Sequence, residues 1–243
     1  MSGADRTVAK KAAARPLRAI RGEPAAGDCW PWSIPAVRQL LADGLEPGAL
    51  TILVGENGSG KSTLVEGIAV AYGMSPEGGS IGARHRTRAT ESPLPERLSF
   101  VRNPGSARWG YFLRAETMHG LYSYLEANPG GPDPVFHELS HGESFVAMLA
   151  ARFSSPGLYL MDEPESALSF TNTLALVHLL EQMVADGTRQ AIVATHSPIL
   201  AATPGAQVWE LGSWGMRRTD WTELALVGQW RRFLADPERF LGD

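Results

Sequence analysis

The sequence is poor in cysteine, in long hydrophobic runs and in net charge. Cys29 is the single cysteine among 243 residues, which excludes an internal disulfide framework and favours a reducing cytoplasm. No run of 18 apolar residues occurs, so we expect no direct membrane insertion. The first residues also lack the apolar stretch of a secretory signal. The net charge of −4 argues against a general nucleic-acid binder. It says nothing about local basic patches.

The composition predicts a globular protein with an ordinary hydrophobic core. Apolar residues make up 44% of the chain and charged residues 20%, and the length suits one large α/β domain. We expect a flexible basic arm at 1–22, where six basic residues accompany one acid, and a single domain at 23–243. The arm is either a solvated tail or a contact for nucleic acid. We expect an irregular insertion at about 73–110, which is rich in arginine: Arg84, Arg86, Arg88, Arg97, Arg102 and Arg108.

A glycine-rich motif lies between an apolar run and an apolar periodic segment. Residues 51–54 read as a strand and residues 64–72 as a helix, so the nine residues between them have the context of a phosphate-binding P-loop. Glycines let successive backbone N–H groups surround phosphate oxygens, and the helix directs its positive end at them. Lys61 supplies a point charge, and the Ser62 hydroxyl is placed for Mg²⁺. The predicted ATP-binding residues are Gly55, Glu56, Asn57, Gly58, Ser59, Gly60, Lys61, Ser62 and Thr63.

The rest of the chain alternates short apolar strands with amphipathic helices. Strands that are apolar throughout are typical of a parallel sheet covered on both faces. We therefore expect an α/β fold whose central sheet is mostly parallel, with small antiparallel elements near the N-terminal segment and the C-terminus. Trp221, Leu224, Val227, Trp230 and Leu234 lie at helical spacing, which predicts a last helix that packs its aromatic residues onto the core. Further strands are expected at 98–101, 111–113, 158–161 and 191–194, helices at 34–41, 117–127, 141–153 and 170–186, and a hairpin at 207–218.

Two acids follow the strand expected at 158–161. Because parallel strands end at one edge of the sheet, Asp162 and Glu163 should arrive beside the phosphates. Asp162 can join the Mg²⁺ shell, and Glu163 can polarise the water that attacks the γ-phosphate. His196 lies two residues past the strand at 191–194 and is predicted to sense the γ-phosphate. Ser140 and Glu143 form a capping box before an apolar helix, which is also a potential anion site.

These motifs occur in one order: P-loop, Leu139-Ser140-His141-Gly142-Glu143, an apolar strand with Asp-Glu, and a strand-terminal histidine. That order resembles the ATP-binding-cassette (ABC) ATPases from about Trp30 to Leu211. The resemblance implies a head-to-tail homodimer with two ATPs between the subunits. Ser140 and Gly142 would then contact the γ-phosphate held by the other subunit. It also suggests Trp30 or Trp32 as the aromatic residue that stacks on adenine, and a core role fits both tryptophans equally well.

The chain departs from the transporter pattern in the same motifs. No glutamine lies between Lys61 and Ser140, and Glu116 is the candidate replacement for the transporter loop glutamine as a metal contact. His141 stands where transporters usually have glycine, and Ser169 stands where they usually have aspartate. The run at 162–169 looks more like the soluble cassette ATPases: the small AAA-type ATPases, the overcoming-lysogenisation-defect group, and the RecF and chromosome-maintenance repair ATPases.

Three functional hypotheses follow. The first is a soluble, Mg²⁺-dependent ATPase that dimerises on ATP and couples turnover to an unidentified partner. The second is the nucleotide-binding subunit of a transporter, which would work through a separate membrane protein. The third is an ATP-gated switch that binds nucleic acid in repair or defence, motivated by the basic arm and by the arginines between residues 84 and 108.

Overall fold

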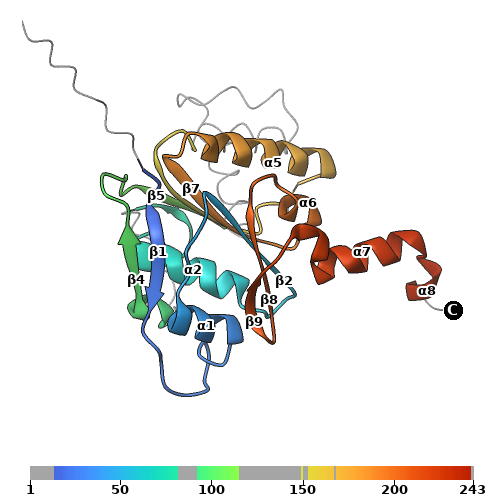
Figure 1. Ribbon diagram of the computed structural model, residues 1–243, viewed down its shortest axis with the longest axis horizontal. Helices are drawn as coiled ribbons and strands as arrows, with labels where there is room; N and C mark the ends of the chain where they lie inside the picture. Colours follow the sequence, from blue (N-terminus) through green and yellow to red (C-terminus); the bar gives the residue numbers. More distant parts are fainter. Residues whose placement is uncertain (1–13, 82–91, 115–148, 150–152, 167, 242–243) are drawn as a thin grey trace, which may run out of the picture.

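The centre of the molecule is a mixed β-sheet. The computed structural model describes residues 14–81, 92–114, 149, 153–166 and 168–241. Within them the sheet has seven strands in the order β3-β5-β6-β7-β2-β8-β9. The five central strands run parallel, and β3 and β9 run antiparallel at the edges, which confirms the expected α/β class (Figure 1). The strands are β2 (Leu50–Gly55), β3 (Gly79–Ser80), β5 (Gly110–Arg114), β6 (Gly157–Asp162), β7 (Arg189–Thr195), β8 (Gln207–Gly212) and β9 (Gly215–Arg218).

Helices cover both faces of this sheet, and the strands supply a core to each. Helices α1 (Pro35–Asp43) and α2 (Lys61–Tyr72) lie on one face, and α5 (Phe170–Ala185) and α6 (Pro198–Ala201) lie on the other (Figure 1). Successive side chains of a strand point to opposite faces. In β6, Leu158 and Leu160 therefore join the core beneath α1 and α2, whereas Tyr159 and Met161 join the core beneath α5. Burial on both faces explains why this strand is apolar throughout.

The N-terminal boundary differs from the expectation. Residues Leu17–Gly22 form β1, which pairs antiparallel with β4 (Leu98–Arg102) after the short 3-10 helix η1 (Leu94–Arg97). The expected arm at 1–22 is thus wrong at its C-terminal end, because Leu17 and Ile20 are buried, at 1% and 0% exposure. The side chain of Gln190 secures this strand, accepting from the Leu17 N–H at 2.8 Å and donating to the Leu17 carbonyl at 3.1 Å. Residues 73–110 are likewise not irregular throughout, since they contain β3, η1 and β4.

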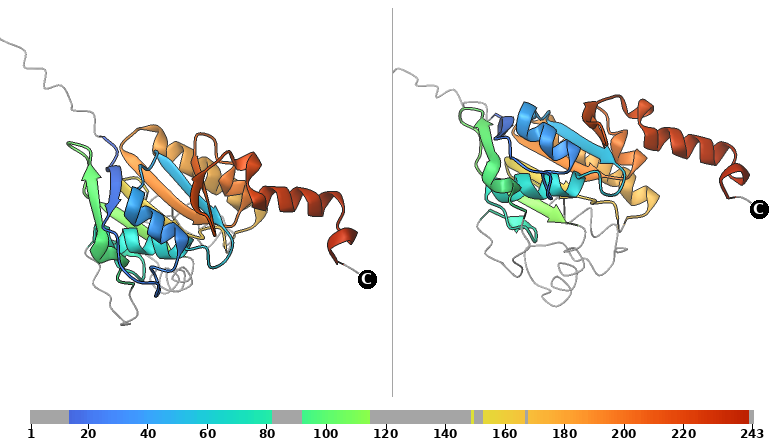
Figure 2. Two further views of the ribbon diagram at one scale, coloured as in Figure 1. Left: turned by 60° about the horizontal axis from the view of Figure 1, so that its bottom comes forward. Right: turned by 90° about the horizontal axis from the view of Figure 1, so that it is seen from below.

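The C-terminal part begins as expected and then leaves the core. The hairpin of β8 and β9 is present and is followed by η3 (Trp221–Glu223), α7 (Ala225–Ala235) and α8 (Glu238–Leu241). The prediction that this helix packs its aromatics onto the core is wrong for Trp230, which is 46% exposed, and Leu234 is 69% exposed. Only the start of α7 reaches the sheet, through Leu224 and Val227, and the rest projects from the body (Figures 1 and 2). Helical spacing predicts an apolar stripe but not what lies opposite it.

Three expected features fall partly or wholly outside the described residues. The helices predicted at 117–127 and 141–153 lie there, apart from Leu149 and Phe153. So do Arg84, Arg86 and Arg88 of the arginine-rich segment. Among the helices that the structure does describe, none is both long and apolar enough to cross a bilayer.

Candidate functional site

The phosphate loop connects β2 to α2 and depends on glycine for its shape. Gly60 has a φ of 98°, and a Cβ there would stand 2.5 Å from Ile34 Cγ2, so this position requires glycine. Helix α2 begins at the next residue, and no described side chain caps it. The first backbone N–H groups of an uncapped helix are free to bind an external acceptor. The loop and helix therefore present an anion-binding surface.

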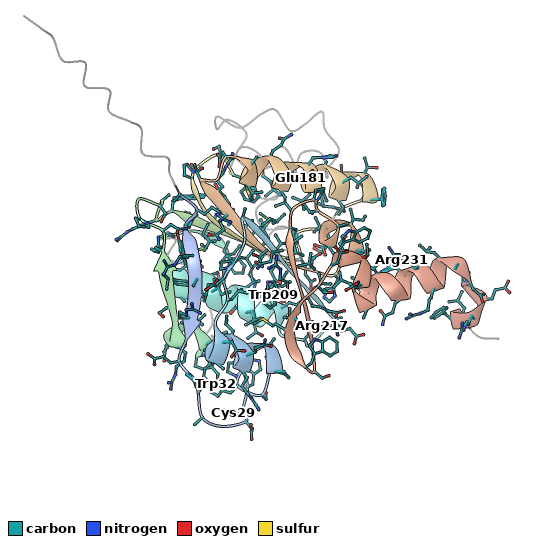
Figure 3. The ribbon with its side chains drawn as sticks, viewed as in Figure 1. Cys29, Trp32, Glu181, Trp209, Arg217 and Arg231 are labelled. Atoms are coloured by element: carbon teal, nitrogen blue, oxygen red, sulfur yellow. The ribbon has the colours of Figure 1, made fainter. Side chains whose placement is uncertain are left out.

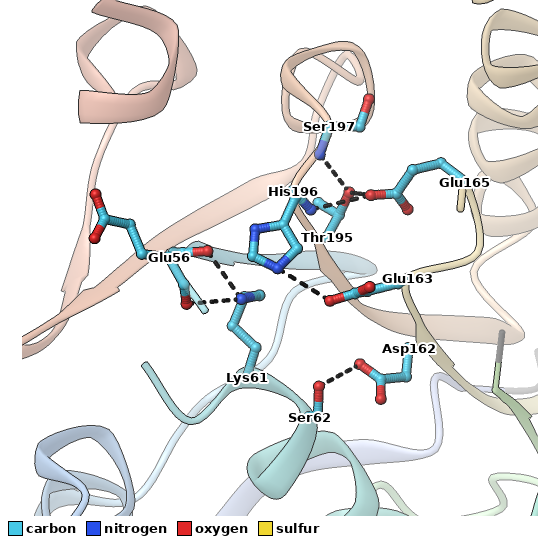
Figure 4. Close-up of polar contacts among 10 residues, drawn as sticks. Glu56, Lys61, Ser62, Asp162, Glu163, Glu165, Thr195, His196 and Ser197 are labelled. Atoms are coloured by element: carbon cyan, nitrogen blue, oxygen red, sulfur yellow. Dashed lines mark hydrogen bonds and ion pairs between the residues drawn. The ribbon is translucent and has the colours of Figure 1, made fainter. Parts of the chain in front are cut away.

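Lys61 lies inside this loop rather than in solvent. Its ammonium donates to the carbonyl oxygens of Gly55 at 2.8 Å and of Glu56 at 3.0 Å (Figure 4). Only 4% of the residue is exposed. Burial lowers the pKa of Lys61, and the nearby carboxylates of Glu163 and Asp162 oppose that shift. An anion bound at the loop would stabilise the charged form of Lys61 and so oppose the effect of burial.

Asp162 meets the loop from the end of β6. Ser62 Oγ donates to Asp162 Oδ1 at 2.9 Å, although 100 residues separate them in sequence (Figure 4). Burial raises the pKa of Asp162, while the Ser62 hydrogen bond and Arg114 oppose the shift. Mg²⁺ in phosphate sites is held by one or two carboxylates together with hydroxyl, water and phosphate oxygens. The two adjacent side-chain oxygens suit that ion.

Glu163 is held in an unusual backbone conformation. Its φ is 50°, and it is the one non-glycine residue with positive φ among the described residues. Its N–H donates to the Ala194 carbonyl at 2.9 Å, which ties the end of β6 to β7. Glu163 Oε1 lies 3.0 Å from His196 Nε2, within ion-pair distance if the imidazole is protonated, although the two groups are not aligned as a hydrogen bond. Strained residues of this kind cluster at functional sites.

The sequence motifs predict no role for Glu165, yet its side chain organises this site. Its Oε1 accepts a hydrogen bond from the Thr195 hydroxyl and another from the His196 N–H, the latter at 3.0 Å (Figure 4). Its Oε2 is buried and has no hydrogen-bond partner among the described residues. Burial raises the pKa of Glu165, and the Thr195 hydrogen bond opposes that shift. The acid-rich turn at 162–165 was visible in the sequence, but nothing there directs this carboxyl at Thr195.

The structure therefore brings Lys61, Ser62, Asp162, Glu163 and His196 to one edge of the sheet. Ser140, Gly142 and Glu116 lie outside the described residues. Of the two candidate adenine-stacking residues, Trp32 is 9% exposed and belongs to the core beside α1 (Figure 3). Trp30 is 54% exposed.

Comparison with known proteins identifies the same family as the sequence motifs do. The family model described as "ABC transporter" matches residues 41–166, a little over half of the chain. Ribose import ATP-binding protein RbsA 2 of Burkholderia pseudomallei (strain 1710b) is 30% identical over 239 aligned residues. That alignment covers 86% of this chain and 44% of the relative. The chain thus spans less than half the length of such curated relatives, so the activity of those whole proteins does not transfer to it directly.

Two solved structures have a similar chain course. A metal-chelate type ABC transporter in an inward-facing conformation has 15% identity and a TM-score of 0.49. The match covers 91% of this chain and 89% of that one. The SMC head domain from Thermotoga maritima has 17% identity and a TM-score of 0.46, with coverages of 86% and 98%.

Proposed function

The chain belongs to the ABC family of ATP-binding proteins, whose match supports ATPase activity, and we propose that it binds ATP at the phosphate loop and hydrolyses it there. The observation that carries this proposal is the convergence of Lys61, Ser62, Asp162 and Glu163 on one edge of the sheet. The backbone amides of Gly55–Thr63 and the Lys61 ammonium hold the phosphates. Lys61 exchanges its bonds to the loop carbonyls for bonds to phosphate oxygens.

Ser62 and Asp162 hold Mg²⁺ in this proposal. The support is their hydrogen bond of 2.9 Å, which places two suitable oxygens side by side. When bound, Mg²⁺ neutralises phosphate charge. Burial makes Asp162 easier to protonate, so a cation beside it also stabilises the charged carboxylate.

Glu163 positions the attacking water, and His196 contacts the γ-phosphate. Both side chains are about one-third exposed, at 35% and 33%, although the His196 Nε2 atom faces Glu163 and is buried. Glu163 is anchored through its backbone to β7 and does not need its carboxylate to hold its place. That carboxylate is therefore free to orient a water molecule. Glu116 stays a prediction as a metal contact.

We further propose that two copies close on two ATPs. Each P-loop would meet Ser140 and Gly142 of the other copy, as a two-fold isologous interface allows. Hydrolysis would then separate the copies and pass the change to a partner.

The test is a Glu163→Gln variant. We expect it to retain ATP binding while phosphate release falls about 10²- to 10⁴-fold, the usual contribution of a positioned base. Light scattering should detect an ATP-dependent dimer that persists in this variant. Glu181→Gln is the matched control, because it removes the same charge from α5 (Figure 3). Wild-type phosphate release by Glu163→Gln would refute the assigned role.

A second candidate is the ATP-binding subunit of a transporter. The observation that favours it is the named relative, a ribose import ATP-binding protein, which aligns with 86% of this chain. The hypothesis of a soluble ATPase is supported instead by the residues at 162–169 and by the missing loop glutamine. Whatever co-purifies with a Glu163→Gln variant in ATP decides between them: a multi-span membrane protein supports the transporter, and a soluble chain or nucleic acid supports the other hypotheses.

A further inference from the structure

A cavity of about 510 Å³ lies beside the phosphate loop. One wall is the loop itself, from Gly55 to Ser59, and another is the turn between β8 and β9. The start of α7 supplies a third wall through Leu226 and Gln229. This volume lies within the range of small-molecule sites, roughly 300–1,000 Å³. The phosphate loop is thus one side of a larger site.

Trp214 forms the aromatic part of this cavity. It occupies the turn between the two strands and is 53% exposed. The guanidinium of Arg217 lies 4.6 Å from the centre of its ring, in cation–π geometry. Gln229, which also lines the cavity, offers an amide that can hydrogen-bond a planar ligand. The site combines an aromatic face with a polar edge.

An ion pair between exposed Arg217 and the buried carboxylate of Glu210 holds this platform in place. Arg217 Nε donates to Glu210 Oε2 at 2.8 Å, and Glu210 is 4% exposed. Glu210 Oε1 in turn accepts from the Ala225 N–H, the first residue of α7, at 2.7 Å. One carboxylate therefore joins β8, β9 and α7 around the Trp214 ring. A preorganised aromatic surface of this kind loses little entropy when it binds a planar group.

The platform lies close to the phosphate loop. Gly55 pairs with Leu211 in the register of β2 and β8, and Leu211 is three residues before Trp214. A ligand that extends from the loop into this cavity would present anionic groups at one end and an aromatic group at the other. A nucleoside triphosphate has that chemistry.

We propose that Trp214 stacks on the base of the nucleotide whose phosphates the loop holds. This inference rests on the proposed ATP-binding function and assigns the base contact to Trp214 instead of Trp30, the candidate that the resemblance suggested. Trp30 and Trp214 are almost equally exposed, at 54% and 53%. Among the described residues that line the cavity, however, Trp214 is present and Trp30 is absent.

The two tryptophans form a matched pair for the experiment. Binding of Mg·ATP and of inorganic triphosphate is measured by calorimetry for the wild type, Trp214→Ala and Trp30→Ala. We expect Trp214→Ala to weaken ATP binding about 5- to 150-fold, the effect typical of losing one base–aromatic stack, and to leave triphosphate binding unchanged. Trp30→Ala should bind both ligands like the wild type.

A second measurement does not depend on a stable alanine variant. We expect ATP, but not triphosphate, to quench tryptophan fluorescence in the wild type and in Trp30→Phe. The quenching should disappear in Trp214→Phe, which keeps an aromatic ring and near-normal ATP affinity.

Several results would overturn the inference. Unchanged ATP affinity in Trp214→Ala would do so, as would an equal loss for ATP and triphosphate, which indicates a disturbed loop. Loss in Trp30→Ala alone would assign the base to Trp30. If the wild type binds neither ligand, the proposed function fails and this inference with it; ATP binding that is insensitive to Trp214 overturns this inference alone.

Discussion

The left-handed backbone of Glu163 predicts an unusual effect of glycine on stability. A non-glycine residue with this φ costs roughly 1–2 kcal/mol, which glycine does not incur. Glycine loses about 0.4–1 kcal/mol more through the entropy of the unfolded chain. The difference leaves Glu163→Gly more stable than Glu163→Ala by about 1 kcal/mol. Both variants lack the carboxylate, so both lose its contact with His196 and its repulsion from Asp162. These two effects therefore cancel when the stabilities of the two variants are compared.

Urea unfolding without nucleotide measures this difference. For a chain of this length, about 1 kcal/mol corresponds to a shift in Tm of roughly 2–4 °C, so thermal unfolding provides a second reading. Position 181, in the interior of α5, is the control. There Glu181→Gly should be less stable than Glu181→Ala by about 1 kcal/mol, because glycine is a poor helix former. The sign of the glycine effect should therefore reverse between positions 163 and 181.

A Glu163→Ala variant at least as stable as Glu163→Gly would refute this reasoning. It would mean that residue 163 does not hold a left-handed conformation, or that the turn relaxes without cost. Loss of ATP hydrolysis is expected in both variants and so does not bear on the conformational argument.

Three further outcomes follow from the buried polar groups. Glu165→Ala leaves the Thr195 hydroxyl and the His196 N–H without their acceptor, so we expect the free energy of unfolding in urea to fall by about 2–4 kcal/mol. Glu165→Gln keeps an acceptor oxygen and should lose less stability. Equal losses in the two variants would contradict this explanation. The pKa of Glu165 is raised by burial, so the folded state binds its proton more tightly. The stability of the wild type relative to Glu165→Gln should then increase as pH falls through the folded pKa, until pH is below the ordinary value of 4.5; a pH-independent difference would contradict it. Gln190→Leu removes the bonds to Leu17, and a loss of about 2–4 kcal/mol is expected; unchanged urea unfolding would show that β1 is held by its other contacts.

The central fold and most of the site were predictable from the sequence. The strands at 158–161 and 191–194 are apolar because both faces of the sheet are covered, and their pattern predicted β6 and β7 to within two residues at each end. Parallel strands place their carboxyl ends at one edge, so Asp162 had to approach the phosphate loop. The hydrogen bond from Ser62 is the outcome.

Features that depend on what lies opposite a side chain were not predictable in this way. Leu17–Gly22 resembles part of a basic arm because arginines dominate its local composition. In the structure, however, pairing with β4 and the hydrogen bond to Gln190 bury the apolar residues of this segment. The spacing of Trp230 and Leu234 indicated an apolar helix face, yet no part of the described chain covers it.

The sequence by itself determined which groups have the chemistry to bind a triphosphate and the order of strands and helices that carries them. It could do so because glycine geometry, strand periodicity and helix capping are local properties of the chain. Only the tertiary structure decided that Glu165 holds the loop of His196 and that Trp214 lines the same cavity as the phosphate loop. Those contacts join residues distant in sequence, and their formation depends on the packing of whole elements, which no local pattern encodes.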